Sequence, residues 1–291
     1  TEVDVRSTVV IRCILSMTSE CLQLQAMNPN LCIKNDASYH DMYYMNPPAK
    51  DLSKIASSDK VKKVQKDFEA THVRPQRLMK TLFTDEAYVK ANVDEARLMR
   101  RLFDLACNMQ SHDTDMQLYS LFTDEECYDL WLISNLNWYI DYGPSPLTQG
   151  KMPYVEANLL ENILNTADTC VVKKENSATL RFGHETCLLP LACLLELGDC
   201  AYQTTDINKL SDIWRNYRIF PKACNIQFVF YRKKGNDNIL VKILLNEQEM
   251  KLPENIRDKA VIEKYLKYSV NRHRVKMYFK DGNAFDNMSF G

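Results

Sequence analysis

The residues with the clearest chemical potential lie close together in the stretch Arg181-Phe-Gly-His-Glu-Thr-Cys187. His184 and Glu185 form an adjacent pair that can bind an anion and move a proton. Arg12, far away in the sequence, carries a planar set of donors that suits a phosphate group. These residue types point to phosphate chemistry. Each also has an ordinary structural interpretation, a turn for the pair and a solvated helix position for the arginine.

The elements around His184 are expected to place it at an anion-binding position. Residues 178–182 favour a short strand, and Gly183 is expected to supply the backbone freedom for a junction. Glu185 and Thr186 suit the N-cap of a following helix. Apolar residues follow at helical spacing, at Leu188, Leu191, Ala192, Leu194 and Leu195. His184 would then sit at the carboxyl end of a central strand and ahead of a helix, where open α/β sheets bind ligands.

The first half of the chain is mostly helical in pattern. Residues 7–27 predict a helix with Arg12 near its beginning, and 32–34 a short strand. An ordered, tyrosine-rich loop is expected over 36–48. From 51 to 142 the sequence is charged and helical. The similar segments 82–88 and 121–128 are interpreted as helix starts, each with a threonine N-cap, and Glu126 completes a capping box with Thr123.

The second half mixes helices with strands. A helix is expected over 154–168, and the runs 226–232 and 239–245 predict a hairpin across a Gly/Asn/Asp turn. A last helix is expected over 255–268. These patterns predict an α/β core formed by residues 1–50 and 151–291, with an all-helical insertion over 51–150.

Composition excludes several classes of function. The 291 residues include 37 basic and 38 acidic ones, so no general basic field argues for nucleic acid. No run approaches the roughly 18 apolar residues of a membrane span, and the first residues are not a signal peptide. Ten scattered cysteines form no Cys-x-x-Cys pair or zinc-type spacing with histidine, so no metal is expected.

Several motifs, in the right order, resemble one family. Residues 181–190 are similar to the Phe-Gly-His-Ala-Glu-Thr signature of the histidine phosphatase superfamily, in its acid phosphatase and phytase branch. Within that branch the chain resembles the multiple inositol polyphosphate phosphatases, from about residue 5 to 255. The supporting segments are 7–17, 142–146, 156–162, 167–168, 228–233 and 241–247.

The resemblance implies an α/β core sheet flanked by helices, and hydrolysis of phosphomonoesters through a phosphohistidine. In that family a histidine in an Arg-His-Gly motif attacks phosphorus, and no cofactor is needed. By motif position Arg12 resembles the arginine that clamps the phosphate, and His184 the second histidine that holds its oxygens. Glu185 resembles the proton donor, although the family usually has His-Ala-Glu and here Glu185 follows His184 directly.

One motif of the family does not occur, because the chain contains no Arg-His-Gly-x-Arg. The segment 271–274 lacks the glycine, and His40, His72 and His112 lack the motif's context. We therefore expect the first strand and the nucleophile to lie in an N-terminal segment missing from this chain.

The leading hypothesis is an enzyme acting on phytate and related small inositol phosphates, with this chain as its C-terminal part. The family's usual location implies the periplasm, the outer surface or secretion. The alternative is a catalytically silent protein that binds inositol phosphates through Arg12 and His184. A purely structural role fits the helical segment but leaves the signature around His184 unexplained.

Overall fold

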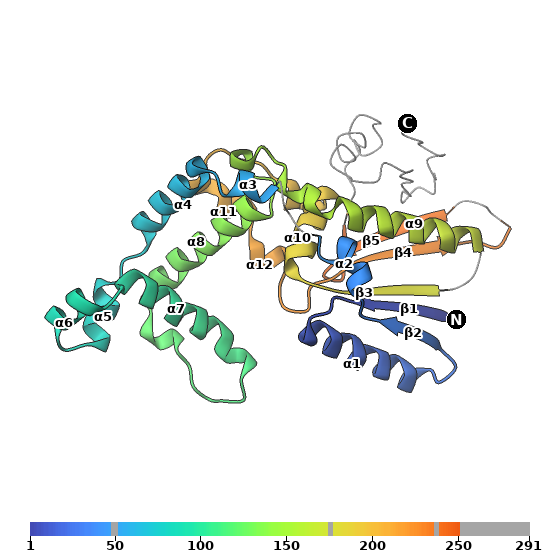
Figure 1. Ribbon diagram of the computed structural model, residues 1–291, viewed down its shortest axis with the longest axis horizontal. Coiled ribbons are helices and arrows are strands. Elements are labelled where there is room, and N and C mark those ends of the chain that lie inside the picture. Colours follow the sequence, from blue (N-terminus) through green and yellow to red (C-terminus); the bar gives the residue numbers. More distant parts are fainter. Residues whose placement is uncertain (48–51, 174–176, 236–238, 251–291) are drawn as a thin grey trace.

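A parallel three-stranded sheet forms the end of the molecule where the chain begins (Figure 1). The computed structural model describes residues 1–47, 52–173, 177–235 and 239–250. The strands are β1 (Glu2–Ser7), β2 (Cys32–Asp36) and β3 (Ser177–Phe182), in the order β2-β1-β3. All pairs are parallel, with Arg6 beside Asp36 on one side and beside Arg181 on the other. The carboxyl ends of the strands point toward the middle of the molecule.

Strand β1 corrects two of the predictions. Residues 2–7 are extended, and the helix expected from residue 7 begins at Ile11, as α1 (Ile11–Met27). Val3, Val5 and Ser7 are buried and alternate with partly exposed Asp4 and Arg6. This period of two is the signature of a strand. β1 is the central strand of the described sheet, and β3, expected to be central, lies at its edge.

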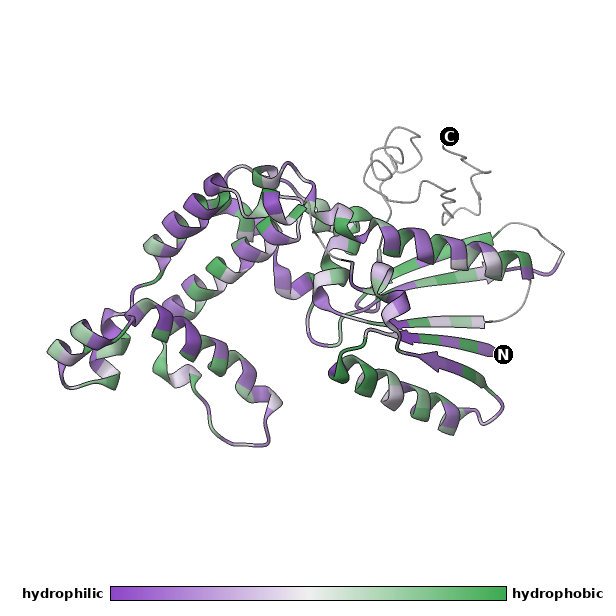
Figure 2. Cartoon of the chain, viewed as in Figure 1, coloured by the Kyte–Doolittle hydropathy of each residue, from purple (hydrophilic) through white to green (hydrophobic). Residues whose placement is uncertain are grey.

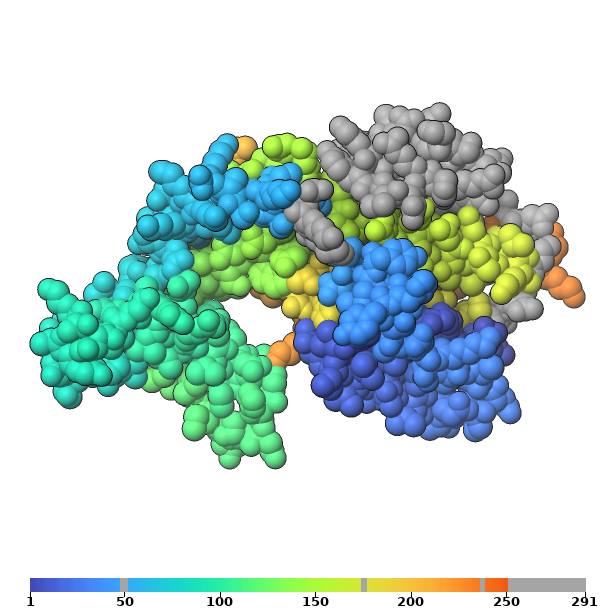
Figure 3. All heavy atoms as spheres, in the orientation of Figure 1, coloured from blue at the N-terminus to red at the C-terminus, as the bar shows by residue number. Residues whose placement is uncertain are grey.

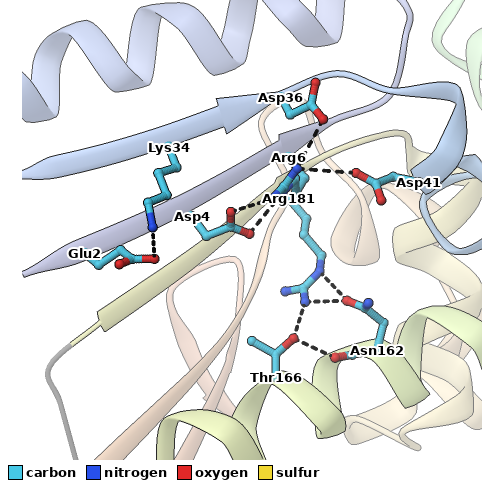
Figure 4. A network of polar contacts seen from close by, with 9 residues as sticks. All are labelled: Glu2, Asp4, Arg6, Lys34, Asp36, Asp41, Asn162, Thr166 and Arg181. Carbon is cyan, nitrogen blue, oxygen red and sulfur yellow. Dashed lines mark hydrogen bonds and ion pairs between the residues drawn. The ribbon is translucent and has the colours of Figure 1, made fainter. Parts of the chain in front are cut away.

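The two faces of this sheet differ in chemistry. Helix α1 covers one face, where Val3 and Val5 pack with Met17 and Cys21 in a small apolar cluster. The other face carries Arg6, which bonds to Asp4 at 2.8 Å, to Asp36 at 3.3 Å and lies 3.8 Å from Asp41 (Figure 4). The sheet is therefore apolar on one side and ionic on the other.

Arg181 on β3 lies beside Arg6 but has a different environment. Its Nη2 donates to Asn162 Oδ1 at 2.5 Å and to Thr166 Oγ1 at 2.9 Å, both on the helix above the sheet (Figure 4). Burial lowers the pKa of this guanidinium. The guanidinium thus anchors β3 to that helix through neutral acceptors.

The helical segment extends away from the sheet as an arm (Figure 1). Its helices are α3 (Leu52–Ala56), α4 (Asp59–His72), α5 (Gln76–Leu82), α6 (Glu86–Asn92), α7 (Glu95–Asn108) and α8 (Asp124–Asp141), with short 3-10 turns at Met109–Ser111 and Tyr119–Leu121. The predicted capping box of Thr123 and Glu126 is confirmed. The other cap prediction was wrong, because Asp85, and not Thr84, accepts from the backbone of Tyr88 to begin α6.

The remaining elements include a second, antiparallel sheet. They are the helices α2 (Met42–Met45), α9 (Ala157–Lys173), α10 (Glu185–Leu194), α11 (Leu210–Ile213) and α12 (Asn216–Ile219), and the strands β4 (Ile226–Arg232), β5 (Ile239–Leu245) and β6 (Gln248–Met250). Short 3-10 turns occupy Tyr39–Asp41, Pro146–Thr148, Met152–Glu156 (η5), Gly198–Ala201 and Ile207–Lys209. The predicted hairpin is confirmed as β4 and β5, and β6 adds a third antiparallel strand. The helix expected over 154–168 begins at Ala157 because η5 precedes it.

Apolar side chains gather where the helical arm meets α10 and the second sheet. Figure 2 shows the mixed colouring of the arm's helices and the apolar residues of β4 and β5. The main core contains fully buried Trp214, Tyr139, Leu136 and Leu189, from α8, α10 and the segment near α11. None of the described helices is long and apolar enough to cross a membrane. The helix expected over 255–268 lies outside the described residues, and the domain boundaries at 50 and 150 remain a prediction.

Candidate functional site

The candidate site forms where the carboxyl ends of β1 and β3 meet. The backbone N–H of Thr8, just after β1, donates to the carbonyl of Phe182 at the end of β3, at 3.0 Å. His184 follows two residues later, in an extended conformation, as the residue that caps α10. The N-cap expected at Glu185 or Thr186 was therefore wrong, whereas the expected negative charge at the start of the helix is present, as Glu185. The side chain of His184 makes no capping bond, because Thr8 and Arg12 hold it instead.

Both ring nitrogens of His184 have a partner. Thr8 Oγ1 lies 3.2 Å from Nε2, and Arg12 Nη2 lies 3.1 Å from Nδ1. A guanidinium can only donate, so Nδ1 accepts from Arg12 and Nε2 carries the proton that it donates to Thr8. These contacts fix the neutral tautomer of His184 with the proton on Nε2.

The electrostatic surroundings favour the same neutral form. Burial lowers the pKa of His184 below its usual 6.5, and the positive charge of Arg12 lowers it further, against a smaller opposite effect of Glu185. A neutral imidazole with N–H on Nε2 keeps one hydrogen-bond donor and puts no second positive charge beside Arg12.

The thiol of Cys13 secures the junction between β3 and α10. It donates to the carbonyl of Gly183 at 3.2 Å and lies 3.9 Å from Nδ1 of His184. Gly183 does not have a positive φ, and an added Cβ would meet no atom closer than 3.8 Å. The junction therefore does not require the backbone freedom that was predicted for this glycine.

Glu185 occupies the first turn of α10 and is exposed to solvent. Besides His184, two further groups sense its charge. Burial raises the pKa of Tyr142, at the end of α8, and raises that of Cys224 to about 11, and the negative charge of Glu185 contributes to both shifts. Glu185 therefore lies near the place where the helical arm, the segment after α12 and the sheet come together.

Figure 3 shows an opening between the green tip of the helical arm and the dark-blue helix α1. Arg12 lies in the first turn of α1 and is exposed. Across the opening, Lys222 hydrogen-bonds to Ser111 of the arm. Arg12 and Glu185, in the first turns of α1 and α10, are both exposed to solvent.

Of the three residues that the sequence singled out, the structure brings Arg12 to His184, and Glu185 follows His184 in the first turn of α10. It also adds two residues, Thr8 and Cys13, to which the sequence gave no role. Both lie inside the segment 7–17 that carries part of the family resemblance, and this was the one signal that could have marked them.

The other described histidines lie elsewhere and have their own partners. His40 packs edge-on against Tyr43, and His72 stacks on Phe68 with 4.0 Å between the ring centroids. His112 lies 3.3 Å from the side-chain amide of Asn108. The segment 271–274 lies outside the described residues. Within the described ranges, no group of three His, Cys, Asp or Glu residues could hold a metal ion.

Comparison with known proteins gives the same family that the motifs indicated. The sequence model described as "Histidine phosphatase superfamily (branch 2)" matches residues 25–246. A search of curated proteins gave no match. The match to the family model covers most of the chain, and it begins in the last turn of α1.

Solved structures show the fold. The crystal structure of Bifidobacterium longum multiple inositol polyphosphate phosphatase in complex with inositol hexasulfate aligns with a TM-score of 0.60 and 18% identity over 82% of this chain. The complex of the same protein with phosphate aligns with a TM-score of 0.50 and 20% identity over 83% of this chain. This chain spans 58% and 57% of the length of those two chains.

Proposed function

The chain belongs to the histidine phosphatase superfamily, branch 2, and we propose that it is part of a phosphatase that hydrolyses inositol polyphosphates. The observation that carries this proposal is the arrangement of His184, held between Thr8 and Arg12 at the amino end of α10 and followed directly by Glu185. These groups can bind a phosphoryl group and protonate a leaving alcohol.

Arg12 and His184 are proposed to hold the oxygens of the phosphoryl group. Arg12 is exposed, and no carboxylate pairs with it among the described residues. Its guanidinium would donate to one phosphoryl oxygen, and the Nε2–H of His184, which donates to Thr8 in this structure, would donate to a second oxygen when the phosphate is bound. Positioned donors of this kind contribute on the order of 10²- to 10³-fold in rate.

Glu185 is proposed as the proton donor to the leaving oxygen. When its carboxyl gives up a proton, the resulting carboxylate lies at the positive end of the α10 helix dipole, which favours the charge. General acid catalysis of this type contributes roughly 10²- to 10⁴-fold. Glu185 follows His184 without the intervening residue of the family pattern, so its carboxyl would reach the leaving oxygen from the position next to His184.

The nucleophile is proposed to be a histidine that is not among the described residues in contact with His184. It would attack phosphorus as the bond to the leaving oxygen breaks and Glu185 protonates that oxygen, and water would then cleave the phosphohistidine to free phosphate. Inositol polyphosphates are proposed as substrates because a solved relative of the same fold was crystallised with inositol hexasulfate.

A second candidate function is binding without hydrolysis. It is favoured by the positions of His40, His72 and His112, none of which contacts the site. In that case Arg12 and His184 would bind an inositol phosphate that is not cleaved.

Phosphate release from phytate separates these possibilities, measured for this chain and for a longer protein that contains it. Release by the longer protein alone supports the phosphatase and places the nucleophile outside this sequence. Release by the short chain would contradict that placement. Silence of both, with retained binding of inositol hexasulfate, favours the binding protein.

We also propose that the protein works in the periplasm, on the outer surface or after secretion, as the family resemblance implies. Fractionation of cells that express the full gene product tests this proposal. Recovery of the protein in the cytoplasmic fraction alone would contradict it.

A further inference from the structure

Glu156 is a buried acid that the proposed reaction does not use. It ends the 3-10 turn η5, just ahead of α9, and η5 packs closely against α10. Only 1% of its surface is exposed, and its Oε2 has no hydrogen-bond partner among the described residues. An unpaired carboxylate in such a place is costly, and a buried carboxyl without a cation is expected to stay protonated.

One hydrogen-bonded side chain connects Glu156 to the candidate site. The thiol of Cys187, in the first turn of α10, shares a hydrogen bond with the Glu156 carboxyl. The same sulfur lies 3.4 Å from the carbonyl of Met45 and 3.9 Å from Asn46 Oδ1. Through its backbone, Cys187 donates to the carbonyl of His184 at 3.0 Å. Glu156 is therefore two hydrogen bonds away from His184.

No nearby charge offsets the burial of Glu156. Burial raises the pKa of Glu156 to about 8, and the only opposing effect is the hydrogen bond from Cys187. The elements packed against η5 carry other titratable groups, none of which contributes to this shift: Lys54 on α3; Glu161, Asp168, Cys170 and Lys173 on α9; Glu185 and Cys193 on α10. Burial also strongly raises the pKa of the Cys187 thiol, so this partner stays neutral as well.

We propose that Glu156, in its neutral form, is a positioning residue that holds the first turn of α10, and with it His184 and Glu185, and that ionisation of Glu156 loosens this turn. The ionised form would be a buried carboxylate whose two oxygens have a single thiol donor, so its charge would be poorly compensated. The effect on folding is independent of any substrate. The effect on turnover rests on the proposed phosphatase function.

The first test is the pH dependence of unfolding of this chain in denaturant. Between about pH 4.5 and 8 the unfolded state loses the proton of Glu156 while the folded state keeps it, so stability falls as pH rises. The unfolding equilibrium constant should rise up to tenfold per pH unit from this group alone. Glu156→Gln, which mimics the neutral acid, should remove that slope.

Glu20→Gln is the matched control, because it makes the same change on an exposed carboxylate of α1. It should keep the slope of the wild-type protein. If Glu156→Gln also keeps the wild-type slope, the proposal is wrong. Should Glu156→Gln fail to fold, the infrared band of the protonated carboxyl in the wild-type protein decides. In the wild-type protein this band should disappear near pH 8. In Cys187→Ser, whose hydroxyl is a stronger donor, it should disappear at a lower pH. Disappearance near pH 4.5 in the wild-type protein would overturn the proposal.

The second test is the pH profile of phosphate release in the active form of the protein. Wild-type kcat should fall above about pH 8 while KM changes little, and Glu156→Gln should retain kcat there. An identical alkaline limb in both proteins would contradict the positioning role. If no form of the protein releases phosphate, the proposed function is wrong. The unfolding measurements then still test the structural role of Glu156.

Discussion

Two arginines lie six residues apart at one end of the sheet, yet their surroundings are opposite. Arg6 is surrounded by the carboxylates of Asp4, Asp36 and Asp41, and its hydrogen bond to Asp4 is the largest cause that raises its pKa. Arg12 contacts the neutral imidazole of His184 and no carboxylate among the described residues. The positive charge of Arg6 is neutralised within the protein, and that of Arg12 is available to an anion.

This difference indicates where a phosphate can bind. An anion near Arg6 would have to displace carboxylates that already bond to the guanidinium, whereas an anion near Arg12 replaces only solvent. His184 adds to the contrast, because it gives Arg12 a fixed position without cancelling its charge. Three substitutions test this contrast, and their expected effects are described from the largest to the smallest.

Replacement of His184 by alanine should have the largest effect. It removes an N–H donor and the group that fixes Arg12, so kcat for phosphate release should fall on the order of 10³-fold. Thermal unfolding should change little, since the imidazole is only half-buried. Steady-state kinetics and a melting curve check both parts. Wild-type rates in this variant would remove His184 from the site.

Replacement of Arg12 by glutamine should reduce kcat/KM for phosphate release on the order of 10²-fold, because one charged clamp on the phosphoryl group is lost. Kinetics with a phosphomonoester substrate measure the loss. An unchanged kcat/KM would show that the exposed charge of Arg12 does not act on the substrate.

The same Arg12→Gln change should raise the pKa of His184 toward 6.5, because one of the two causes that lower it disappears while burial remains. A histidine held neutral in the folded state makes stability fall as pH drops through 6.5, so this acid loss should become smaller in the variant. NMR titration of the imidazole and unfolding at several pH values check it. A pKa that stays unchanged would contradict the contact between Arg12 and His184.

Replacement of Arg6 by glutamine is the matched control and should have the smallest effect. Activity should stay within about twofold of wild type, and the free energy of unfolding should fall by about 1 kcal/mol or less, because these ion pairs are partly exposed and screened by water. Chemical denaturation in low and high salt measures the change. A loss of activity equal to that of Arg12→Gln would contradict the claim that only the charge of Arg12 is available to an anion.

The sequence predicted the local part of the site better than its long-range part. The helix after Glu185 repeats apolar residues at helical spacing, so α10 and the position of His184 could be foreseen. Strand β1 was missed because its alternation is short and because Asp4 and Arg6, which are charged, fill its second face. A run of six residues with three charges gives a weak signal.

Contacts between distant segments could not be foreseen in this way. Thr8 and Arg12 reach His184 across more than 170 positions of sequence, and nothing in their local patterns specifies that pairing. Glu156 is a similar case. Its neighbours predicted a helix, but its burial depends on how η5 packs against α10, which periodicity within one segment does not determine.

The most direct test of the account is the binding of inositol hexasulfate, which cannot be hydrolysed as a phosphate ester, to this chain by titration calorimetry. Wild-type protein and Arg6→Gln should bind with similar affinity, and Arg12→Gln should bind at least tenfold more weakly. The loss should shrink at high salt. Equal affinities for Arg12→Gln and wild type, or an equal loss in Arg6→Gln, would contradict the claim that Arg12 and His184 form the anion site.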